Sequence, residues 1–307
     1  MRILCIINDR AGQSDISIYE CIRAIGKSGS ETVVRYLHGG TSLREVTRDA
    51  SQFDRVIACG GDGTVTGVCY AMRGTGAPVL AYPAGTANLL AMNLRMPYDP
   101  RELAAITLGN ETTPIDICEL SVGEVGTPER RTEGFMIAAG AGFDASIMLA
   151  AQELKPSIGV SAYLVGALAN LMPTISKFRL TLDGKTVETE GIAVLVANVA
   201  RLQFDLPLIH ASDPRDGLFE VIVLRTRNAF ELIPAVWAAI IDRTTGQHAD
   251  RTAGVETYVA SHVRIEADPA LPVQFDGELL ASSTPFEARV LPENALLLVS
   301  DKYFLVP

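Results

Sequence analysis

The stretch Gly60-Gly61-Asp62-Gly63-Thr64 is the feature around which the chain is organised. The apolar segment 53–59 before it predicts a buried parallel strand, and residues 65–73 after it predict the start of a helix. Glycines let backbone approach a ligand without Cβ clashes, and free N–H groups at a helix start attract anions. A carboxylate inside such a loop suits a phosphate only when a divalent cation bridges the two. The pentapeptide therefore predicts a site for phosphate and metal, with a tight strand-to-helix connection as the alternative.

The first part of the chain alternates predicted strands with predicted helices. This order is typical of a parallel sheet with helices on both faces. Ligands of such sheets sit at the carboxyl ends of the strands, so the loops at 8–12, 60–64 and 83–88 are expected to meet in one crevice. The expected elements are strands at 2–7, 32–37, 53–59 and 78–82, a helix capped by Ser14 or Asp15 with Ile18, Cys21 and Ile25 on one face, and helices at 42–50, 65–73 and from about 88.

After about Asp116 predicted strands dominate, and Asp183-Gly184 is a two-residue hairpin signal. This pattern predicts an antiparallel β-sandwich. We expect an ATP-binding domain at 1–120 and a lipid-binding domain at 121–307. The alternative for the C-terminal end of the second domain is that it packs with the first domain. The polar run 123–132 predicts a hairpin or exposed loop. The other expected elements are strands at 115–120, 134–139, 177–182, 192–198, 218–224, 255–266, 273–275, 286–290 and 295–299, and helices at 160–171 and 229–241.

Composition narrows the class of protein. The 307 residues are 48% hydrophobic and 20% charged, with a net charge of −10, which disfavours nucleic-acid binding and membrane docking by overall charge. The five cysteines lie in apolar patterns without C-x-x-C spacing, as reduced core thiols of a cytoplasmic protein do. Segment 157–176 carries no charge and is long enough to span a membrane, but its Ser, Gly, Asn and Pro favour a partly buried helix, with interfacial lipid contact as the alternative.

Several common catalytic patterns are absent from the sequence. There is no G-x-G-x-x-G, no Walker loop and no G-x-S-x-G, and the four histidines are scattered. The chemistry is therefore expected from carboxylates. Asp213 and Asp216 stand in one turn at a spacing that suits a hard cation. Asp216-Gly217 and Asp276-Gly277 taken alone are more typical of ordinary turns.

Taken together, the motifs resemble the diacylglycerol and sphingosine-type lipid kinases, and most closely their bacterial soluble branch. The pentapeptide alone also occurs in NAD kinases and phosphofructokinases, so the likeness depends on the ordered set, which spans nearly the whole chain. The motifs are Gly60-Gly61-Asp62-Gly63-Thr64, Pro83-x-Gly85-Thr86-x-Asn88, Gly140-x-Gly142-Phe143-Asp144-Ala145, Gly159-x-x-Ala162-Tyr163, Asp216-Gly217 and Asp276-Gly277-Glu278.

This resemblance implies a kinase that needs ATP and Mg²⁺, with an NAD kinase-like α/β domain, a β-sandwich domain and an active site in the cleft between them. It implies Asp62 as the residue that organises the catalytic Mg²⁺ and Asp116 as an acid behind it. Asp276 matches the general base, supported by Glu278. A structural cation site is implied at Asp213, Asp216 and the carbonyl of Leu218. The residues implied to contact ATP are Asn8, Gly60, Gly61, Asp62, Gly63, Thr64, Gly85, Thr86 and Asn88.

Some positions depart from the family pattern. Leu89-Leu90 follow Asn88 where Asp-Phe is common, and Thr66-Gly67 replace a usual Asn-Glu pair that contacts the nucleotide. Asp9 stands where Pro is common. Residues 201–207 replace a glycine-rich segment at the place where the acceptor would approach, which indicates an unusual substrate.

Three functions stay open on the sequence. The first is a lipid kinase that phosphorylates a hydroxyl of a diacylglycerol- or sphingoid-like acceptor. The second is an NAD kinase or another kinase of soluble alcohols, and the third is a catalytically weak lipid-binding or regulatory protein of the same fold. The expected partners are ATP and a lipid, without nucleic acid. A homodimer and transient contact with the inner membrane face stay open.

Overall fold

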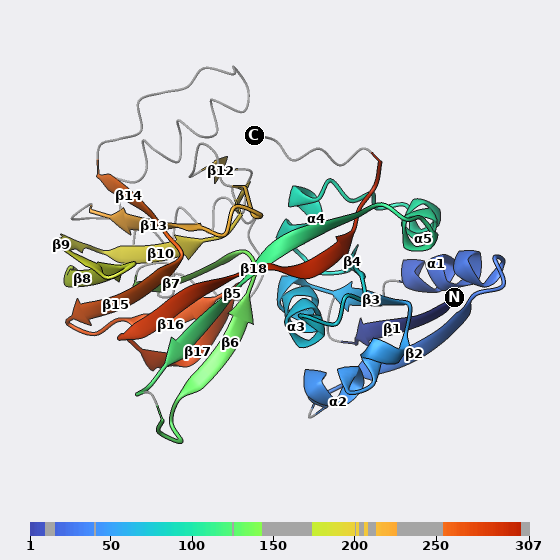
Figure 1. Cartoon of the computed structure of the whole chain (residues 1–307), viewed down its shortest axis with the longest axis horizontal. Coiled ribbons are helices and arrows are strands. Elements are labelled where there is room, and N and C mark those ends of the chain that lie inside the picture. Colours follow the sequence, from blue (N-terminus) through green and yellow to red (C-terminus); the bar gives the residue numbers. More distant parts are fainter. Residues whose placement is uncertain are drawn as a thin grey trace, which may run out of the picture.

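A computed structural model of the protein describes residues 1–9, 16–39, 41–124, 126–142, 174–199, 201–202, 206–207, 213–225 and 254–301. Figure 1 shows one lobe built around β1 to β4 and a second lobe of mostly antiparallel strands, with α3 between them. The following predictions lie outside the described residues: the caps Ser14 and Asp15, the motif residues 143–145 and 159–163, the helices at 160–171 and 229–241, and residues 203–205.

The first lobe contains four parallel strands in the order β2-β1-β3-β4. Helix α1 buries Ile18, Cys21 and Ile25, as the predicted spacing requires. All five cysteines of the chain are buried, and none of them forms a disulfide. The elements of this lobe are β1 (Arg2–Asn8), α1 (Ser17–Gly26), β2 (Glu31–Leu37), α2 (Leu43–Thr47), the 3₁₀ helix η1 (Ala50–Gln52), β3 (Arg55–Gly60), α3 (Asp62–Met72), β4 (Val79–Pro83), α4 (Leu89–Asn93) and α5 (Pro100–Leu108).

The long strand β18 (Phe286–Leu298) joins the two lobes, as Figure 1 shows. It pairs antiparallel with β5 (Thr112–Val122), and near its end Leu297 aligns in parallel with Val79 of β4. The prediction of two strands at 286–290 and 295–299 is wrong. A register shift between Leu291 and Ala295 lets one strand absorb the extra residues without ending, as β-bulges do.

The second lobe packs two layers of strands around an apolar core. One layer is a six-stranded antiparallel sheet, ordered β14-β13-β10-β7-β16-β17, and the other continues the ten-stranded sheet through β18, β15, β8 and β9. This confirms the predicted α/β domain followed by an antiparallel β domain. The remaining strands are β6 (Arg131–Phe135), β7 (Ala138–Gly142), β8 (Ser176–Leu182), β9 (Lys185–Gly191), β10 (Ala193–Ala197), β11 (Arg201–Leu202), β12 (Leu206–Pro207), β13 (Phe219–Leu224), β14 (Val255–Ala260), β15 (His262–Asp268), β16 (Pro272–Phe275) and β17 (Glu278–Ser283).

Two further strand predictions are corrected by the structure. The expected strand 255–266 is broken at Ser261, where the chain passes from the six-stranded sheet into the ten-stranded one. The expected strand 134–139 is interrupted at Met136 and Ile137, whose N–H groups donate to a side chain instead of a neighbouring strand. In contrast, Asp183 and Gly184 both have positive φ and form the predicted hairpin turn between β8 and β9.

Helix α5 was not predicted, although its signals are local. Asp99 accepts hydrogen bonds from the N–H groups of Arg101 and Glu102, and Pro100 occupies the first turn. Of the uncharged segment 157–176, only residues 174–176 are described. None of the helices in the described ranges combines the length and the apolar character needed to cross a bilayer.

Candidate active site

The glycine loop joins β3 directly to α3. Gly60 ends the strand, Asp62 begins the helix, and Gly61 between them is extended. The helix thus starts three residues before the expected position 65. A Cβ on Gly60 would lie 2.6 Å from the Cβ of Thr64, closer than non-bonded side-chain atoms approach. This turn therefore has room only for glycine.

A second loop packs against the first, backbone to backbone. A Cβ on Gly85 would lie 2.4 Å from the Cα of Gly61. Asn88 has a left-handed backbone (φ 51°), and its side chain accepts from the N–H of Gly85 at 2.7 Å and donates to the Gly85 carbonyl at 2.8 Å. Thr86 is exposed in this loop. Asn88 therefore holds Gly85 against the glycine loop.

Two hydrogen bonds complete this edge of the sheet. Nδ2 of Asn8, at the end of β1, donates to Oγ1 of Thr64 at 2.7 Å. The N–H of Leu90 in α4 donates to Oδ1 of Asp62 at 3.0 Å. The ends of β1, β3 and β4 thus meet at the carboxyl edge of the sheet, where ligands of such folds sit.

The second lobe contributes the turn Asp276-Gly277 between β16 and β17. Four hydrogen bonds converge on the Asp276 carboxylate. Its Oδ1 accepts from the N–H groups of Ile137 (2.9 Å) and Ala138 (3.0 Å), and its Oδ2 accepts from the N–H of Met136 (3.0 Å) and the hydroxyl of Thr66 (2.7 Å). These four donors hold both oxygens of the carboxylate in place.

These hydrogen bonds and burial have opposite effects on the pKa of Asp276. Burial raises its pKa to about 6, while the hydrogen bonds from Thr66 and the three N–H groups favour the charged form and lower the pKa. The carboxyl group is consequently mostly ionised at neutral pH, with a pKa close enough to neutrality for proton transfer.

Glu278 brings a second carboxylate to the start of α3. Its Oε1 lies 2.7 Å from the place that a Cβ on Gly63 would occupy. A helix start favours a nearby negative charge. Burial and, after it, the charge of Glu278 raise the pKa of Glu133 on β6. Residues more than 200 positions apart in the sequence therefore form one site.

Asp116 lies in a different environment. It is buried, and its carboxylate accepts from the N–H groups of Gly217 (2.8 Å) and Glu293 (2.7 Å). Burial raises the pKa of Asp116, against the effect of these two bonds. The described contacts thus join Asp116 to residues 213–218 and to the bulge of β18, and none joins it to the glycine loop.

The residues predicted for a structural cation site have other partners. The carboxylate of Asp213 pairs with the guanidinium of Arg215 at 3.0 Å, and Oδ1 of Asp216 accepts from the N–H of Leu218 at 2.8 Å. No cluster of three or more His, Cys, Asp or Glu side chains suited to a metal occurs in the described part of the chain. The assignment of a cation to this turn stays a prediction.

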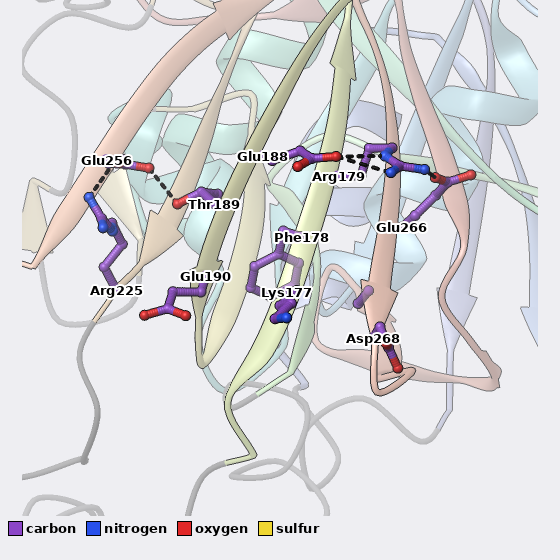
Figure 2. Close-up of a pocket in the computed structure, with 11 residues that line it drawn as sticks. Lys177, Phe178, Arg179, Glu188, Thr189, Glu190, Arg225, Glu256, Glu266 and Asp268 are labelled. Carbon is purple, nitrogen blue, oxygen red and sulfur yellow. Dashed lines mark hydrogen bonds and ion pairs between the residues drawn. The ribbon is translucent and has the colours of Figure 1, made fainter.

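A charged cavity of about 810 Å³ is lined by none of these loop residues, and Figure 2 shows the side chains that line it. It is bordered by β8, β9 and β15, and none of its lining residues was predicted for the site. Its lining has five carboxylates beside three cationic side chains, so it repels phosphate. The charged lining residues are Lys177, Arg179, Glu188, Glu190, Arg225, Glu256, Glu266 and Asp268.

Sequence reasoning missed the part that Thr66 plays, and treated it as the loss of a nucleotide contact. The structure gives it a hydrogen bond to Asp276, 210 residues away. Tyr70, one helical turn further along α3, donates to Glu119 at 2.6 Å. The spacing of Asp62, Thr66 and Tyr70, four residues apart on one helix face, is the only local signal for these contacts.

Comparison with known families identifies the class to which this fold and site belong. The diacylglycerol kinase catalytic domain matches residues 2–120, and the YegS C-terminal NAD kinase beta sandwich-like domain matches residues 137–299. The chain belongs to this family of YegS-like and diacylglycerol lipid kinases.

Individual relatives align with this chain over most of their length. A Klebsiella pneumoniae protein named "Probable lipid kinase YegS-like" is 27% identical over 94% of this chain and 93% of its own. A Mycobacterium tuberculosis diacylglycerol kinase is 27% identical over 87% of each chain. The crystal structure of a diacylglycerol kinase from Bacillus anthracis superposes with a TM-score of 0.70 at 18% identity, covering 99% of this chain and 98% of that one, which shows a shared fold.

Proposed function

We propose that the protein transfers the γ-phosphate of ATP to a hydroxyl of a diacylglycerol- or sphingoid-like lipid, with Mg²⁺ as cofactor. Membership of a kinase family supports phosphoryl transfer. The observation that carries the proposal is the meeting of the glycine loop with the 276–278 turn, through the Thr66–Asp276 hydrogen bond and the approach of Glu278 to Gly63. Phosphoryl transfer depends on such positioning of phosphate-binding and proton-accepting groups.

The nucleotide is assigned to the edge formed by the loops at 60–64 and 83–88, together with Asn8. Helix α3 begins at this edge without a side-chain hydrogen bond at its N-cap, and a helix start favours phosphate. Asp62 fits a hard cation, since Leu90 uses only Oδ1 and no described contact occupies Oδ2. Bound there, Mg²⁺ would neutralise phosphate charge.

The acceptor is assigned to the side of Asp276 and Glu278. The oxygen of the lipid hydroxyl attacks the γ-phosphorus and forms the new P–O bond, while the bond to the bridging oxygen breaks and ADP leaves. The hydroxyl proton passes to Asp276, whose pKa of about 6 suits a base at neutral pH. Glu278, the first residue of β17, is exposed and lies beside the start of α3. We assign it a supporting role to Asp276 where the hydroxyl approaches.

Phosphoryl transfer from labelled ATP tests the assignment. The purified protein is incubated with Mg²⁺ and diacylglycerols or sphingoid bases in mixed micelles, with NAD in a parallel reaction and Asp276→Asn as control. We expect label in a lipid, and loss of that label in the variant. Transfer to NAD alone would establish a kinase for a soluble alcohol. Saturable lipid binding without any transfer would instead establish a lipid-binding protein.

The cellular setting is part of the proposal. Five buried cysteines without a disulfide suit the reducing cytoplasm, where ATP is also available. A lipid acceptor then requires transient contact with the membrane face. Flotation with liposomes tests this contact, and sedimentation velocity tests whether a homodimer forms.

A further inference from the structure

One face of α3 contacts the second lobe along its length. Gly63, Thr66 and Tyr70 follow one another at spacings of three and four residues, which places them on the same face of a helix. Gly63 lies against Glu278, Thr66 donates to Asp276, and Tyr70 donates to Glu119. The helix that begins with the glycine loop therefore touches both acceptor-side carboxylates and a third carboxylate on β5.

Thr66 differs from the other donors to Asp276. The three N–H donors come from residues 136–138, which belong to the same lobe as Asp276. The Thr66 hydroxyl is the described donor that comes from the glycine-loop helix, and Thr66 is only 2% exposed. It therefore links the carboxylate to the helix without being open to solvent.

The hydroxyl also has a chemical property that the N–H groups lack. It donates to an ionised carboxylate and, after rotation about its C–O bond, accepts from a protonated one. A backbone N–H only donates. When the oxygen that it contacts is protonated, the N–H therefore faces the carboxyl hydrogen and loses its acceptor. Thr66 can consequently satisfy Asp276 before and after proton uptake.

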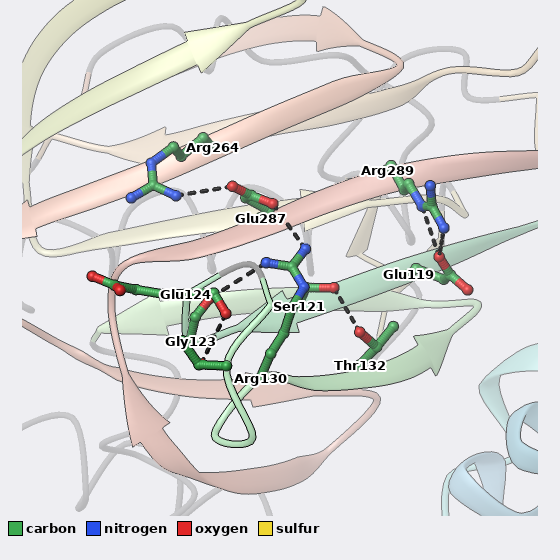
Figure 3. Close-up of polar contacts among 10 residues, drawn as sticks. Glu119, Ser121, Gly123, Glu124, Arg130, Thr132, Arg264, Glu287 and Arg289 are labelled. Atoms are coloured by element: carbon green, nitrogen blue, oxygen red, sulfur yellow. Dashed lines mark hydrogen bonds and ion pairs between the residues drawn. The ribbon is translucent and has the colours of Figure 1, made fainter.

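Tyr70 fixes the other end of the same face. Its hydroxyl donates to Oε1 of Glu119. The guanidinium of Arg289 on β18 pairs with Oε2 of the same carboxylate, as Figure 3 shows. A Cβ on Gly134 would lie 2.3 Å from the Tyr70 ring, so β6 has a glycine where the ring packs. Although burial raises the pKa of Glu119, the hydrogen bonds from Tyr70 and Arg289 lower it below its usual value, so the link is ionic.

We propose that Thr66 is a positioning residue for phosphoryl transfer, which holds the Asp276 carboxylate in register with the glycine loop, and that Tyr70 is the second anchor of this register. The inference rests on the proposed function, because it assigns Asp276 as the proton acceptor. Thr66 occupies the position of an asparagine in the family pattern and provides a hydroxyl there.

Steady-state kinetics of Thr66→Val, Thr66→Ser and Tyr70→Phe test the inference in the full chain. Valine keeps the shape of threonine without its hydroxyl, and serine keeps the hydroxyl. Hydrogen bonds to charged groups have effects on the order of tenfold to a hundredfold. We expect kcat to fall about tenfold in Thr66→Val, with KM for ATP within about twofold, and to recover in Thr66→Ser. Tyr70→Phe should lower kcat by about threefold.

A titration separates failure of this inference from failure of the proposed function. Carboxyl-labelled aspartate is followed by NMR against pH, and Asp276→Asn identifies the signal. Two titratable groups near Asp276 are Glu278, two residues away, and the Cys118 thiol of β5, whose raised pKa reflects burial first and then the charges of Asp116 and Asp276. Both are present in every Thr66 variant, so a change in the Asp276 signal reports on Thr66.

Removal of a donor to the charged form should move the Asp276 titration in Thr66→Val above its wild-type midpoint, and Thr66→Ser should restore it. A wild-type protein that phosphorylates nothing would end the proposed function, yet this shift would still support the contact. An active Thr66→Val with unchanged kcat and titration would overturn the inference alone. Equal losses in valine and serine variants would also overturn it, because packing rather than the hydroxyl would then be responsible.

Discussion

The two sides of the site are built in different ways. The glycine-loop side consists of adjacent residues, and its shape depends on backbone atoms that leave no room for a Cβ. The Asp276 side is centred on a carboxylate whose four donors come from residue 66 and residues 136–138. Added atoms should therefore damage the shape of the first side, whereas lost hydrogen bonds should damage the second; the one carboxylate of the first side, Asp62, is a separate case.

The largest effect is expected where charge is removed from the glycine-loop side itself. Asp62→Asn keeps an oxygen for the N–H of Leu90 but loses the negative charge proposed to hold Mg²⁺. Loss of one such electrostatic contact lowers kcat by roughly a hundredfold to a thousandfold. Measurement of kcat against Mg²⁺ concentration checks this, and circular dichroism should show a native fold. An unfolded variant would instead make Asp62 a structural residue.

A smaller effect, on stability, is expected when one methyl group is added to the same side. In Gly85→Ala the new Cβ meets the Gly61 backbone at 2.4 Å, and backbone cannot rotate away as a side chain can. The free energy of unfolding should fall by about 2–3 kcal/mol in urea titrations. Gly26→Ala is the matched control, because nothing lies within 4 Å of its added Cβ. Equal stability of the two variants would show that the loops are not in contact.

The Asp276 side should instead respond to pH. Its folded pKa of about 6 lies above the usual aspartate value of 3.8, so the native state binds more protons between these values. Stability of the wild type should therefore fall, relative to Asp276→Asn, as pH rises from about 4 to 6, by on the order of 2 kcal/mol. Urea titrations of both proteins at several pH values measure the difference. A constant difference would mean that burial does not raise this pKa.

The same contrast explains what the sequence could predict. The loops at 60–64 and 83–88 are contiguous motifs, so their glycines and Asn88 were identified before the fold was known, and so was the α/β and antiparallel β arrangement. The link from Thr66 to Asp276 spans 210 residues and depends on how the lobes pack, which no local pattern encodes. The break at Ser261 also depends on how the sheets pack. Strands β14 and β15 follow each other in the sequence without a turn signal, and only the sheets that they join separate them. Helix α5 was missed despite a local Asp99-Pro100 signal.

The far end of α3 offers the smallest test. Arg289 pairs with Glu119, whose side chain is 7% exposed, whereas Arg179 pairs with Glu188, whose side chain is 71% exposed. Arg289→Met leaves the buried carboxylate with the Tyr70 hydroxyl as its described side-chain partner, so unfolding free energy should fall by about 1 kcal/mol. Arg179→Met breaks two solvated pairs, with Glu188 and Glu266, and should cost less than about 0.5 kcal/mol. Thermal unfolding of both variants measures the difference. Equal losses would show that Glu119 gains no more from its arginine than a surface carboxylate does, and the anchor at Tyr70 would then rest on packing against Gly134.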